Sequence, residues 1–374
     1  MNLENTKLNE VLDYEQPTKY IVETTEYDDS FETPPVLTAG KSFLLGYTND
    51  KTGIFMDVPA IIFDDFTTSF HYVDFPFKVK SSAMKILTPK EDFVDLKYVY
   101  LQMQQVRIDT QLHKRYWISK FSNKEIPVPK VDIQNKNTKT QQRIAAILDN
   151  AAALRDKTAQ LLTEYDLLAQ SIFLEMFGGD PVLNPKEWKK SKTIDYCQCI
   201  VPGRDKPKSF TGNTPWVTTN DLIHLGFTDS SKIEKGLSKN EIDQVRAKVI
   251  PVDSVILTCV GDLGIVTVIK KEMVVNQQLH TFQCSDEINS VFLMYNLSFQ
   301  KPYMHKMASS TTVPYMNKTI ANGIPTIVPP IELQNQFAEK IALIEQQKAL
   351  AKQELQESED LFNCLLQQAF KGEL

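Results

Sequence analysis

The sequence predicts an α+β protein made of two tandem globular units, each followed by one long helix. Residues 141–177 have the apolar periodicity of a single uninterrupted helix, and matching residues recur 193 positions later, at 334–372. The segments that precede both helices contain short β-like runs separated by turn residues. Repetition of the same order of elements indicates a tandem duplication.

The first predicted helix covers 37 residues, 141–177, without Pro or Gly. At about 1.5 Å of rise per residue it would be roughly 55 Å long. Thr140 is its expected N-cap, and Gly178 marks its end. A heptad seam runs through Ile144, Ile147, Ala151, Leu154, Thr158, Leu161, Tyr165, Leu168 and Ile172. Such a seam predicts packing against another helix.

The second predicted helix shares eight identities with the first in the ungapped overlay, among them Gln141 with Gln334 and Gly179 with Gly372. Extended segments containing Pro precede both helices. Its apolar stripe runs through Phe337, Ile341, Ile344, Ala351, Leu355, Phe362 and Leu365, with Lys348 and Ser358 in the gaps. A stripe with polar breaks also favours helix-on-helix packing.

The globular segments are predicted to mix strands and short helices. Strands are expected at 43–45, 53–56, 60–63 and 75–79, with a helix at 96–112. The second unit repeats this scheme, with strands at 249–250, 255–258, 265–269 and 281–282 and a helix at 291–301. The predicted division is 1–133 for the first globular domain, 134–180 for the first long helix, 181–330 for the second domain and 331–374 for the second helix.

Composition places the chain among ordinary globular proteins, with 42% hydrophobic and 24% charged residues. The sequence contains no run of eighteen apolar residues and begins without a basic or apolar leader, so we expect a cytoplasmic protein without a membrane span. Five thinly spread cysteines argue against a disulfide framework. A net charge of −6 disfavours nonspecific nucleic-acid binding but leaves room for a local basic surface.

A basic and aromatic cluster precedes the first long helix. It comprises Lys114, Arg115, Tyr116, Ser119 and Lys120, with Lys41 as an outlying candidate. Basic side chains suit phosphate contacts, and hydroxyls can contact phosphate or base edges. Overlaying Pro127 on Pro325 places Lys120 opposite Lys318. A solvated helix end packed over an aromatic ring is an equally good reading of this cluster.

The second unit offers a comparable set of candidates. They are Lys206, Lys208, Asn220, Gln277, Gln278, Thr311, Asn317 and Lys318. Amide side chains can read adenine through two hydrogen bonds, whereas the lysines would contact phosphates. A charge run is more often just a solvated face, and an amide triplet also occurs at ordinary strand ends.

Catalytic patterns are missing from the sequence. The five histidines are scattered, and Cys197 and Cys199 form the only close cysteine pair, so no zinc spacing appears. Asp64 and Asp65 could bind a metal, which leaves a metal-dependent nuclease as one alternative. A coiled-coil scaffold that organises protein partners without DNA is another.

The Pro-rich segment from Ile324 to Gln334, its counterpart from Thr140 to Ile144, and the ending Phe370-Lys371-Gly372-Glu373-Leu374 resemble the specificity subunit of type I restriction-modification systems. The resemblance implies two target recognition domains, each reading one half of a bipartite site in double-stranded DNA. It also implies that the long helices pair as an antiparallel coiled coil.

The same resemblance implies that chemistry belongs to partner subunits. Two methyltransferase subunits would use S-adenosylmethionine, and restriction or translocase subunits would use ATP and Mg, whereas this chain would hold no cofactor and catalyse nothing. The helices would bind partners, with the expected positions being Ile144, Leu154, Leu161, Tyr165, Leu168, Ile172, Phe337, Ile344, Leu355 and Phe362.

Overall fold

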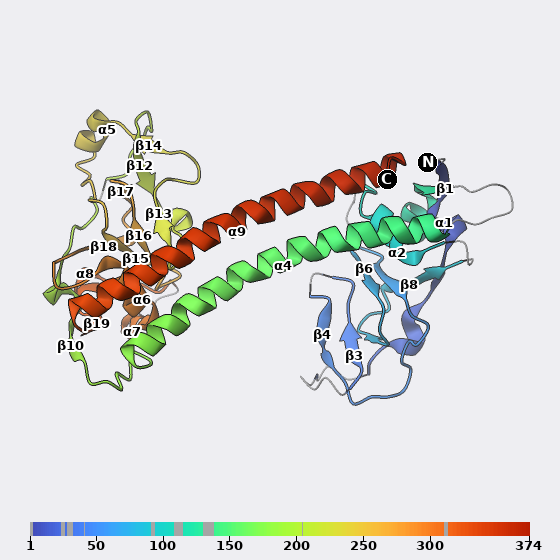
Figure 1. The fold of residues 1–374 in the computed structure, drawn as a ribbon, viewed down its shortest axis with the longest axis horizontal. Helices are drawn as coiled ribbons and strands as arrows, with labels where there is room; N and C mark the ends of the chain where they lie inside the picture. Colours follow the sequence, from blue (N-terminus) through green and yellow to red (C-terminus); the bar gives the residue numbers. More distant parts are fainter. Residues whose placement is uncertain are drawn as a thin grey trace. The chain divides into compact units, whose positions relative to one another are not determined.

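The computed structural model describes residues 3–23, 27, 33–40, 42–90, 94–107, 115–129, 138–203, 205–309 and 313–374. The chain forms two compact units, which we call unit 1 (residues 1–158 and 354–374) and unit 2 (residues 159–353). Two long helices, α4 (Thr138–Phe177) and α9 (Ile331–Lys371), each contribute one half to each unit (Figure 1). The compact units therefore divide both helices, whereas the predicted domain boundaries kept each helix whole.

The described residues of unit 1 form three small sheets, with strand orders β2-β8-β5-β6, β4-β3-β7 and β1-β9. Its strands are β1 (Leu3–Lys7), β2 (Leu12–Glu15), β3 (Pro35–Leu37), β4 (Leu44–Tyr47), β5 (Ala60–Asp64), β6 (Phe70–Val73), β7 (Lys78–Val79), β8 (Met84–Pro89) and β9 (Glu125–Pro129). Its shorter helices are α1 (Leu8–Val11), η1 (Pro17–Tyr20), α2 (Leu96–Met103), α3 (Tyr116–Ser119) and η2 (Phe121–Asn123). Helix α2 ends nine residues before the predicted end at Leu112, and the last five of those positions lie outside the described residues.

Unit 2 also has three sheets, with strand orders β11-β18-β15-β16-β13, β14-β12-β17 and β10-β19. Its strands are β10 (Lys189–Lys192), β11 (Cys197–Gln198), β12 (Thr214–Val217), β13 (Phe227–Thr228), β14 (Gly236–Leu237), β15 (Val255–Thr258), β16 (Val266–Ile269), β17 (Val274–Val275), β18 (Leu279–Cys284) and β19 (Pro325–Val328). Its shorter helices are η3 (Thr193–Asp195), η4 (Thr219–Asp221), α5 (Lys239–Gln244), α6 (Ser290–Phe299), α7 (Lys301–Met307) and α8 (Lys318–Asn322).

The two units repeat one topology, which confirms the predicted duplication. In each unit, the first and last strands pair antiparallel, β1 with β9 and β10 with β19. In each, a central antiparallel sheet has the same core, β2-β8-β5-β6 in unit 1 and β11-β18-β15-β16 in unit 2. A three-stranded sheet with one parallel and one antiparallel pairing completes each unit.

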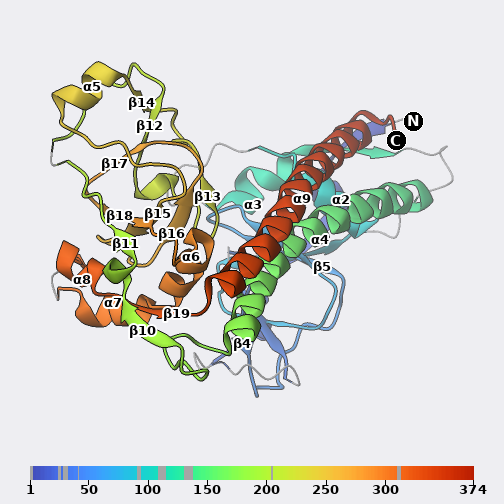
Figure 2. The same ribbon diagram turned by 60° about the vertical axis from the view of Figure 1, so that its left-hand side comes forward.

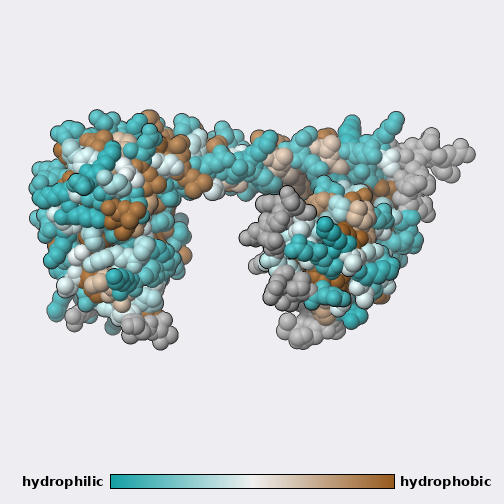
Figure 3. Space-filling view, turned by 90° about the horizontal axis from the view of Figure 1, so that it is seen from below, coloured by the Kyte–Doolittle hydropathy of each residue, from teal (hydrophilic) through white to brown (hydrophobic). Residues whose placement is uncertain are grey.

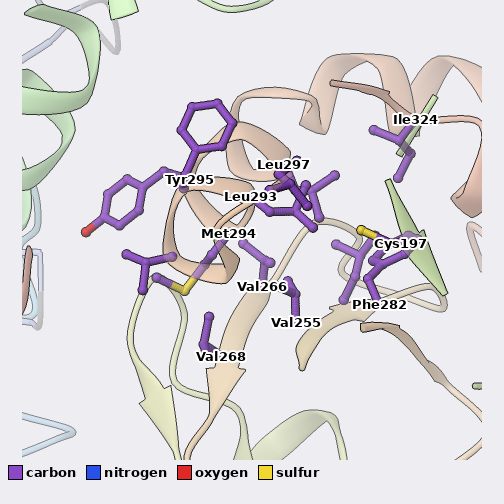
Figure 4. Close-up of a cluster of buried hydrophobic side chains, with 14 of the residues drawn as sticks. Cys197, Val255, Val266, Val268, Phe282, Leu293, Met294, Tyr295, Leu297 and Ile324 are labelled. Carbon is purple, nitrogen blue, oxygen red and sulfur yellow. The ribbon is translucent and has the colours of Figure 1, made fainter. Parts of the chain in front are cut away.

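Alternation along the central strands divides their side chains between two cores. On β5, Ile61 and Phe63 join one buried cluster and Ala60 and Ile62 join another, as the two-residue period of a strand requires. In unit 2, Figure 4 shows side chains of β15 and β16 facing the buried face of α6. Burial of both sheet faces explains why these strands read as short apolar runs.

The long helices pack against each other in antiparallel directions, as expected. In unit 2, Phe177 of α4 lies 5.5 Å from Phe337 of α9, measured between ring centroids. Lys348, which follows Phe337 on α9, forms an ion pair of 2.8 Å with Asp166, which precedes Phe177 on α4. Residue numbers therefore rise along one helix as they fall along the other (Figure 2).

The predicted seam of α9 is confirmed, but that of α4 needs a correction. Phe337, Ile344 and Phe362 are buried, and Leu355 is half-buried. On α4 the positions spaced by seven, from Ile144 through Tyr165 to Ile172, lie in or beside the seam, whereas Leu154 and Leu168 are 51% and 46% exposed. Leu148 and Ala169, four residues after a heptad position, are buried there instead. Arg155 and Leu162, also four residues after, and the predicted Ile147 and Leu161, three residues after, are all half-buried.

The repeated glutamines at the helix starts have matching roles. Gln141 is 1% exposed and accepts a hydrogen bond of 2.8 Å from the backbone N–H of Asp95, the N-cap of α2. Gln334 is fully buried and accepts one of 2.9 Å from the N–H of Asn289, the N-cap of α6. Each glutamine thus ties a long helix to the globular part of its own unit.

The surface visible in Figure 3 is mainly hydrophilic, with hydrophobic residues scattered over it. Among the helices of the described residues, none has the length and apolar character needed to cross a membrane.

Candidate nucleic-acid interface

Four of the predicted DNA-binding residues of unit 2 meet at one groove beside α8. Gln277 and Gln278 come from the turn between β17 and β18, and Asn317 and Lys318 come from the start of α8. We call this hollow, of about 860 Å³, the α8 groove. Its lining residues are Val201, Pro202, Cys259, Val260, Gln277, Gln278, Leu279, His280, Tyr315, Met316, Asn317, Lys318 and Thr319. Lys318 is the one formal charge in this set, so no carboxylate of the lining would repel a phosphate.

Backbone and side-chain hydrogen bonds hold the glutamine turn against the sheet. The Gln278 backbone N–H donates to Asn276 Oδ1 and its carbonyl accepts from Cys259 N–H, at 3.1 and 2.9 Å. Asn276 Nδ2 donates in return to Gln278 Oε1 at 3.1 Å. Both glutamine side chains are exposed. The turn therefore presents them from a fixed backbone, which favours specific reading over loose contact.

Asn317 begins α8 as its N-cap. Its Oδ1 accepts a hydrogen bond of 2.9 Å from the backbone N–H of Ile320, so the amide nitrogen is the part directed to other groups. Lys318 follows as the first residue of the helix and is exposed. The Asn317 amide group and the Lys318 ammonium group therefore lie together at one end of the groove.

A smaller pocket of about 330 Å³ continues from the groove, since Gln277 and Gln278 line both. Asp205, Lys206 and Trp216 also line it. The Trp216 ring lies 5.1 Å from the Phe210 ring, and Lys235 Nζ lies 5.8 Å from the Trp216 ring and 4.8 Å from the Phe210 ring. The pocket thus adds an aromatic ring, a lysine and one carboxylate to the surface that begins at the groove.

Lys208 lines an adjoining hollow together with Lys206 and Glu241. Hydrogen bonds from the Ser209 side chain and from the Ser238 backbone lower the pKa of Glu241 to about 2. The carboxylate also accepts from the backbone N–H of Thr211 at 3.2 Å. Glu241 therefore anchors the segment that carries the two lysines.

The other candidates of unit 2 lie away from this surface or cannot be placed. Asn220 is exposed in η4, and its carbonyl accepts a hydrogen bond from Lys232 Nζ. Asn220 is not among the lining residues of the groove or of the Trp216 pocket. Thr311 lies outside the described residues.

The candidates of unit 1 surround the short helix α3. Arg115, Ser119 and Lys120 are exposed, and the Ser119 hydroxyl donates to the Arg115 carbonyl. Tyr116 is only 1% exposed, so a DNA contact by its ring would require α3 to move. Lys120 Nζ lies 5.7 Å from the Tyr116 ring centroid. Lys41 and Lys114 lie outside the described residues.

The expected equivalence of Lys120 with Lys318 is wrong by two residues. Tyr116 N–H donates to the carbonyl of Asp65, and Met316 N–H donates to that of Cys259, which occupies the same place after the equivalent strand. This register has an offset of 200 residues and places Lys318 opposite Ile118. The segment between α3 and β9 has the same length as its counterpart in unit 2, but the Pro residues lie at different positions in the two strands. Overlaying the Pro residues therefore gave the wrong register.

The acidic pair considered for a nuclease site has structural roles. Asp64 Oδ1 accepts from the N–H groups of Phe66 and Thr67, both at 2.8 Å, and closes a turn. Asp65 is 1% exposed and pairs with Lys85. Within the described ranges, no group of three His, Cys, Asp or Glu side chains is arranged to hold a metal ion.

Two candidates for DNA contact were missed from the sequence. Tyr315, 48% exposed, and Trp216 line the groove and its adjoining pocket. A partly exposed aromatic beside amides is a typical nucleic-acid contact, but its exposure depends on tertiary packing. No signal in the sequence separates these side chains from core residues.

Comparison with known proteins shows similarity to one group of DNA-recognition proteins. A family model described as type I restriction modification DNA specificity domain matches residues 185–359. The specificity subunit of the Escherichia coli type I restriction enzyme EcoR124I/EcoR124II is 39% identical over 259 residues, which cover 66% of this chain and 62% of that relative. The match thus spans less than two thirds of that relative's length. The HindI specificity subunit of Haemophilus influenzae is 23% identical over 366 residues, covering 89% of this chain and 76% of that one.

A solved structure has the same fold. The S subunit of a type I restriction-modification system from M. genitalium superposes with a TM-score of 0.65 at 16% identity, covering 99% of this chain and 96% of that one. The duplicated α+β units and the paired long helices therefore have the fold of that S subunit. In sequence, the matched part of the chain is similar to type I restriction-modification specificity subunits.

Proposed function

We propose that this chain is the DNA-specificity subunit of a type I restriction-modification complex. Unit 1 and unit 2 each read one half of a bipartite sequence in double-stranded DNA. The observation that carries this proposal is the α8 groove, where amides and a lysine from separate segments share a surface whose described lining has no carboxylate. Amides that can contact base edges beside a phosphate-binding cation are the combination that sequence reading requires.

The chain directs chemistry without performing it. Methyltransferase subunits supply S-adenosylmethionine-dependent methylation, and restriction or translocase subunits supply ATP- and Mg-dependent cleavage. The hydrogen-bonded roles of Asp64 and Asp65 leave the nuclease alternative without a site. Similarity to type I specificity subunits in turn favours DNA reading over a scaffold that binds protein partners alone.

The paired helices provide a surface for the partner subunits. Leu154 and Leu168 on α4 and Leu343 and Leu350 on α9 are between 46% and 61% exposed. Large apolar side chains exposed on these helices favour a surface that another protein covers. Some of the residues predicted to bind partners are instead buried between the two helices. These residues would pack beneath the exposed leucines.

The proposal is tested by expressing the chain with its methyltransferase subunit and mapping methylated adenines by single-molecule sequencing. Methylation of one bipartite motif, lost when this chain is omitted, is the expected result. Active methyltransferase that modifies the same sites with and without the chain would contradict the proposal.

A further inference from the structure

The two units place a buried polar side chain at the same strand position, below the surfaces that carry the candidate DNA contacts. Lys85 on β8 lies opposite Phe63 of β5, and His280 on β18 lies opposite Leu257 of β15. These strands occupy the same places in the two central sheets. Lys85 is 2% exposed and His280 is 5% exposed. A buried polar group at a repeated position needs hydrogen-bond partners, and these partners differ between the units.

In unit 1, Lys85 holds a carboxylate that begins α3. Lys85 Nζ lies 3.4 Å from Asp65 Oδ2, and both side chains are 2% exposed. Asp65 Oδ1 accepts a hydrogen bond of 2.8 Å from Trp117 N–H, and its carbonyl accepts one of 2.9 Å from Tyr116 N–H. Asp65, which directly follows β5, thus accepts hydrogen bonds from the first two N–H groups of α3. This helix is flanked by the exposed Arg115 and Lys120.

In unit 2, His280 connects the segments around the α8 groove. Its Nε2 lies 2.8 Å from Oδ1 of Asn322, the last residue of α8, so this nitrogen carries the proton and donates. The same nitrogen lies 3.2 Å from Sγ of Cys199, which precedes the groove residues Val201 and Pro202. Along the chain, His280 belongs to the strand that follows the glutamine turn. Three segments that line the groove therefore meet at one imidazole.

Unit 1 has Lys and unit 2 has His at this position because the residue just after the neighbouring strand differs between the units. Asp65 of unit 1 corresponds to Cys259 of unit 2. The backbone N–H of each donates to the carbonyl of the residue two positions before the buried polar residue, Lys85 or His280. Burial raises the pKa of Cys259 to about 12, so this position supplies no anion. A buried ammonium group without an anion is costly, whereas an imidazole can be neutral, and burial lowers the pKa of His280.

We propose that this strand position is the positioning point of each recognition surface: Lys85 with Asp65 places α3 in unit 1, and His280 with Asn322 places α8 in unit 2. The inference rests on the proposed function, since it assigns each pair to one half of the bipartite site. It adds that the two halves are set independently, by different chemistry at one repeated position.

The test in unit 1 uses two variants that both remove the buried charges. D65N/K85M retains an oxygen that can accept from Trp117 N–H, whereas D65A/K85M does not. In unit 2, H280Q retains an amide that can donate to Asn322, whereas H280L does not. Within each pair only the first variant keeps the hydrogen bond, and the variants of one unit serve as controls for the other.

Each variant complex, with its methyltransferase subunit, is given a plasmid library that carries randomised bases, and methylated adenines are mapped by long-read sequencing. We expect D65A/K85M to relax discrimination in one half of the motif by about 5- to 150-fold per base pair, the range for a lost base contact. H280L should relax only the other half. D65N/K85M and H280Q should keep both halves close to wild type.

Relaxation of the same half by both sets of variants, or unchanged discrimination by D65A/K85M and H280L, would overturn the inference. Hydrogen exchange of the free chain supplies a readout that does not need DNA. Amides of α3 should exchange at least roughly tenfold faster in D65A/K85M than in D65N/K85M, and amides of α8 faster in H280L than in H280Q. Equal exchange within each pair would refute positioning even if the wild-type complex methylated no bipartite motif, an outcome that would refute the proposed function separately.

Discussion

Gln334 illustrates how one side chain can decide where a long helix meets its domain. Its Oε1 accepts from Asn289 N–H, and its Nε2 donates to the carbonyls of Pro329 and Glu287, at 2.8 and 3.2 Å. The identity of this residue with Gln141 was visible in the sequence, but two of its three partners, Asn289 and Glu287, lie in a distant segment. Buried amides of this kind are specific because each unmade hydrogen bond costs desolvation energy.

Replacing Gln334 by Ala should lower the free energy of unfolding of unit 2 by about 2–4 kcal/mol, because one buried donor and two carbonyls lose their partners. Chemical denaturation followed by circular dichroism measures this change. Q346A, at an exposed position of the same helix, should change it by less than about 0.5 kcal/mol. Equal effects of the two substitutions would show that the hydrogen bonds do not matter.

Lys318 is expected to contact a phosphate. K318A should weaken binding to all DNA sequences similarly and reduce the slope of log affinity against log salt by about one unit, since one fewer counterion is released. Titrations of the methyltransferase complex at several salt concentrations measure the slope. K352A, on an exposed face of α9, is the matched control. A slope unchanged in K318A would remove this lysine from the interface.

Among the secondary-structure elements, α4 shows where periodicity alone was ambiguous. Ile144, Ala151, Thr158 and Tyr165 recur every seven residues, and a seam can continue from each with either the third or the fourth following residue. The more apolar choice includes Leu154 and Leu168, but the structure buries Leu148 and Ala169 instead. The small side chain of Ala169 suits close packing of the helices. The rejected leucines are left on the surface that we assign to partner subunits.

Substitutions in α4 should separate the two seams. L148A should destabilise unit 1 by about 2–5 kcal/mol, because Leu148 of α4 is fully buried in a cluster with residues of α2 and α9. L154A should change stability by less than about 0.5 kcal/mol, because Leu154 is 51% exposed. Thermal and urea denaturation of the isolated chain measure both effects. A larger loss from L154A would restore the seam predicted from the sequence.

For the whole molecule, the main consequence is that each compact unit is discontinuous in sequence. Unit 1 takes residues 354–374 from the end of the chain, and its cluster of Ile144, Leu148, Phe362, Leu366 and Ala369 joins both long helices. The folding of unit 1 therefore depends on residues that follow all of unit 2. A division into consecutive domains does not describe this dependence.

Deleting residues 354–374 should destabilise unit 1 by more than about 5 kcal/mol, since Phe362 and Leu366 both leave its core. Unit 2, with its own core, should remain folded. Hydrogen exchange read by mass spectrometry should show lost protection in α2 and retained protection in β15 and β16. Equal loss of protection in the two units would contradict their division.

The sequence by itself determined the duplication, the two long helices and the α+β class, because these depend on periodicity and on local breakers such as Gly178. It also identified Gln277, Gln278, Asn317 and Lys318 by residue type. Only the tertiary structure brought these four together, buried Tyr116, and placed His280 beneath the groove. Exposure and proximity depend on contacts between distant segments, so periodicity and residue type could not predict them.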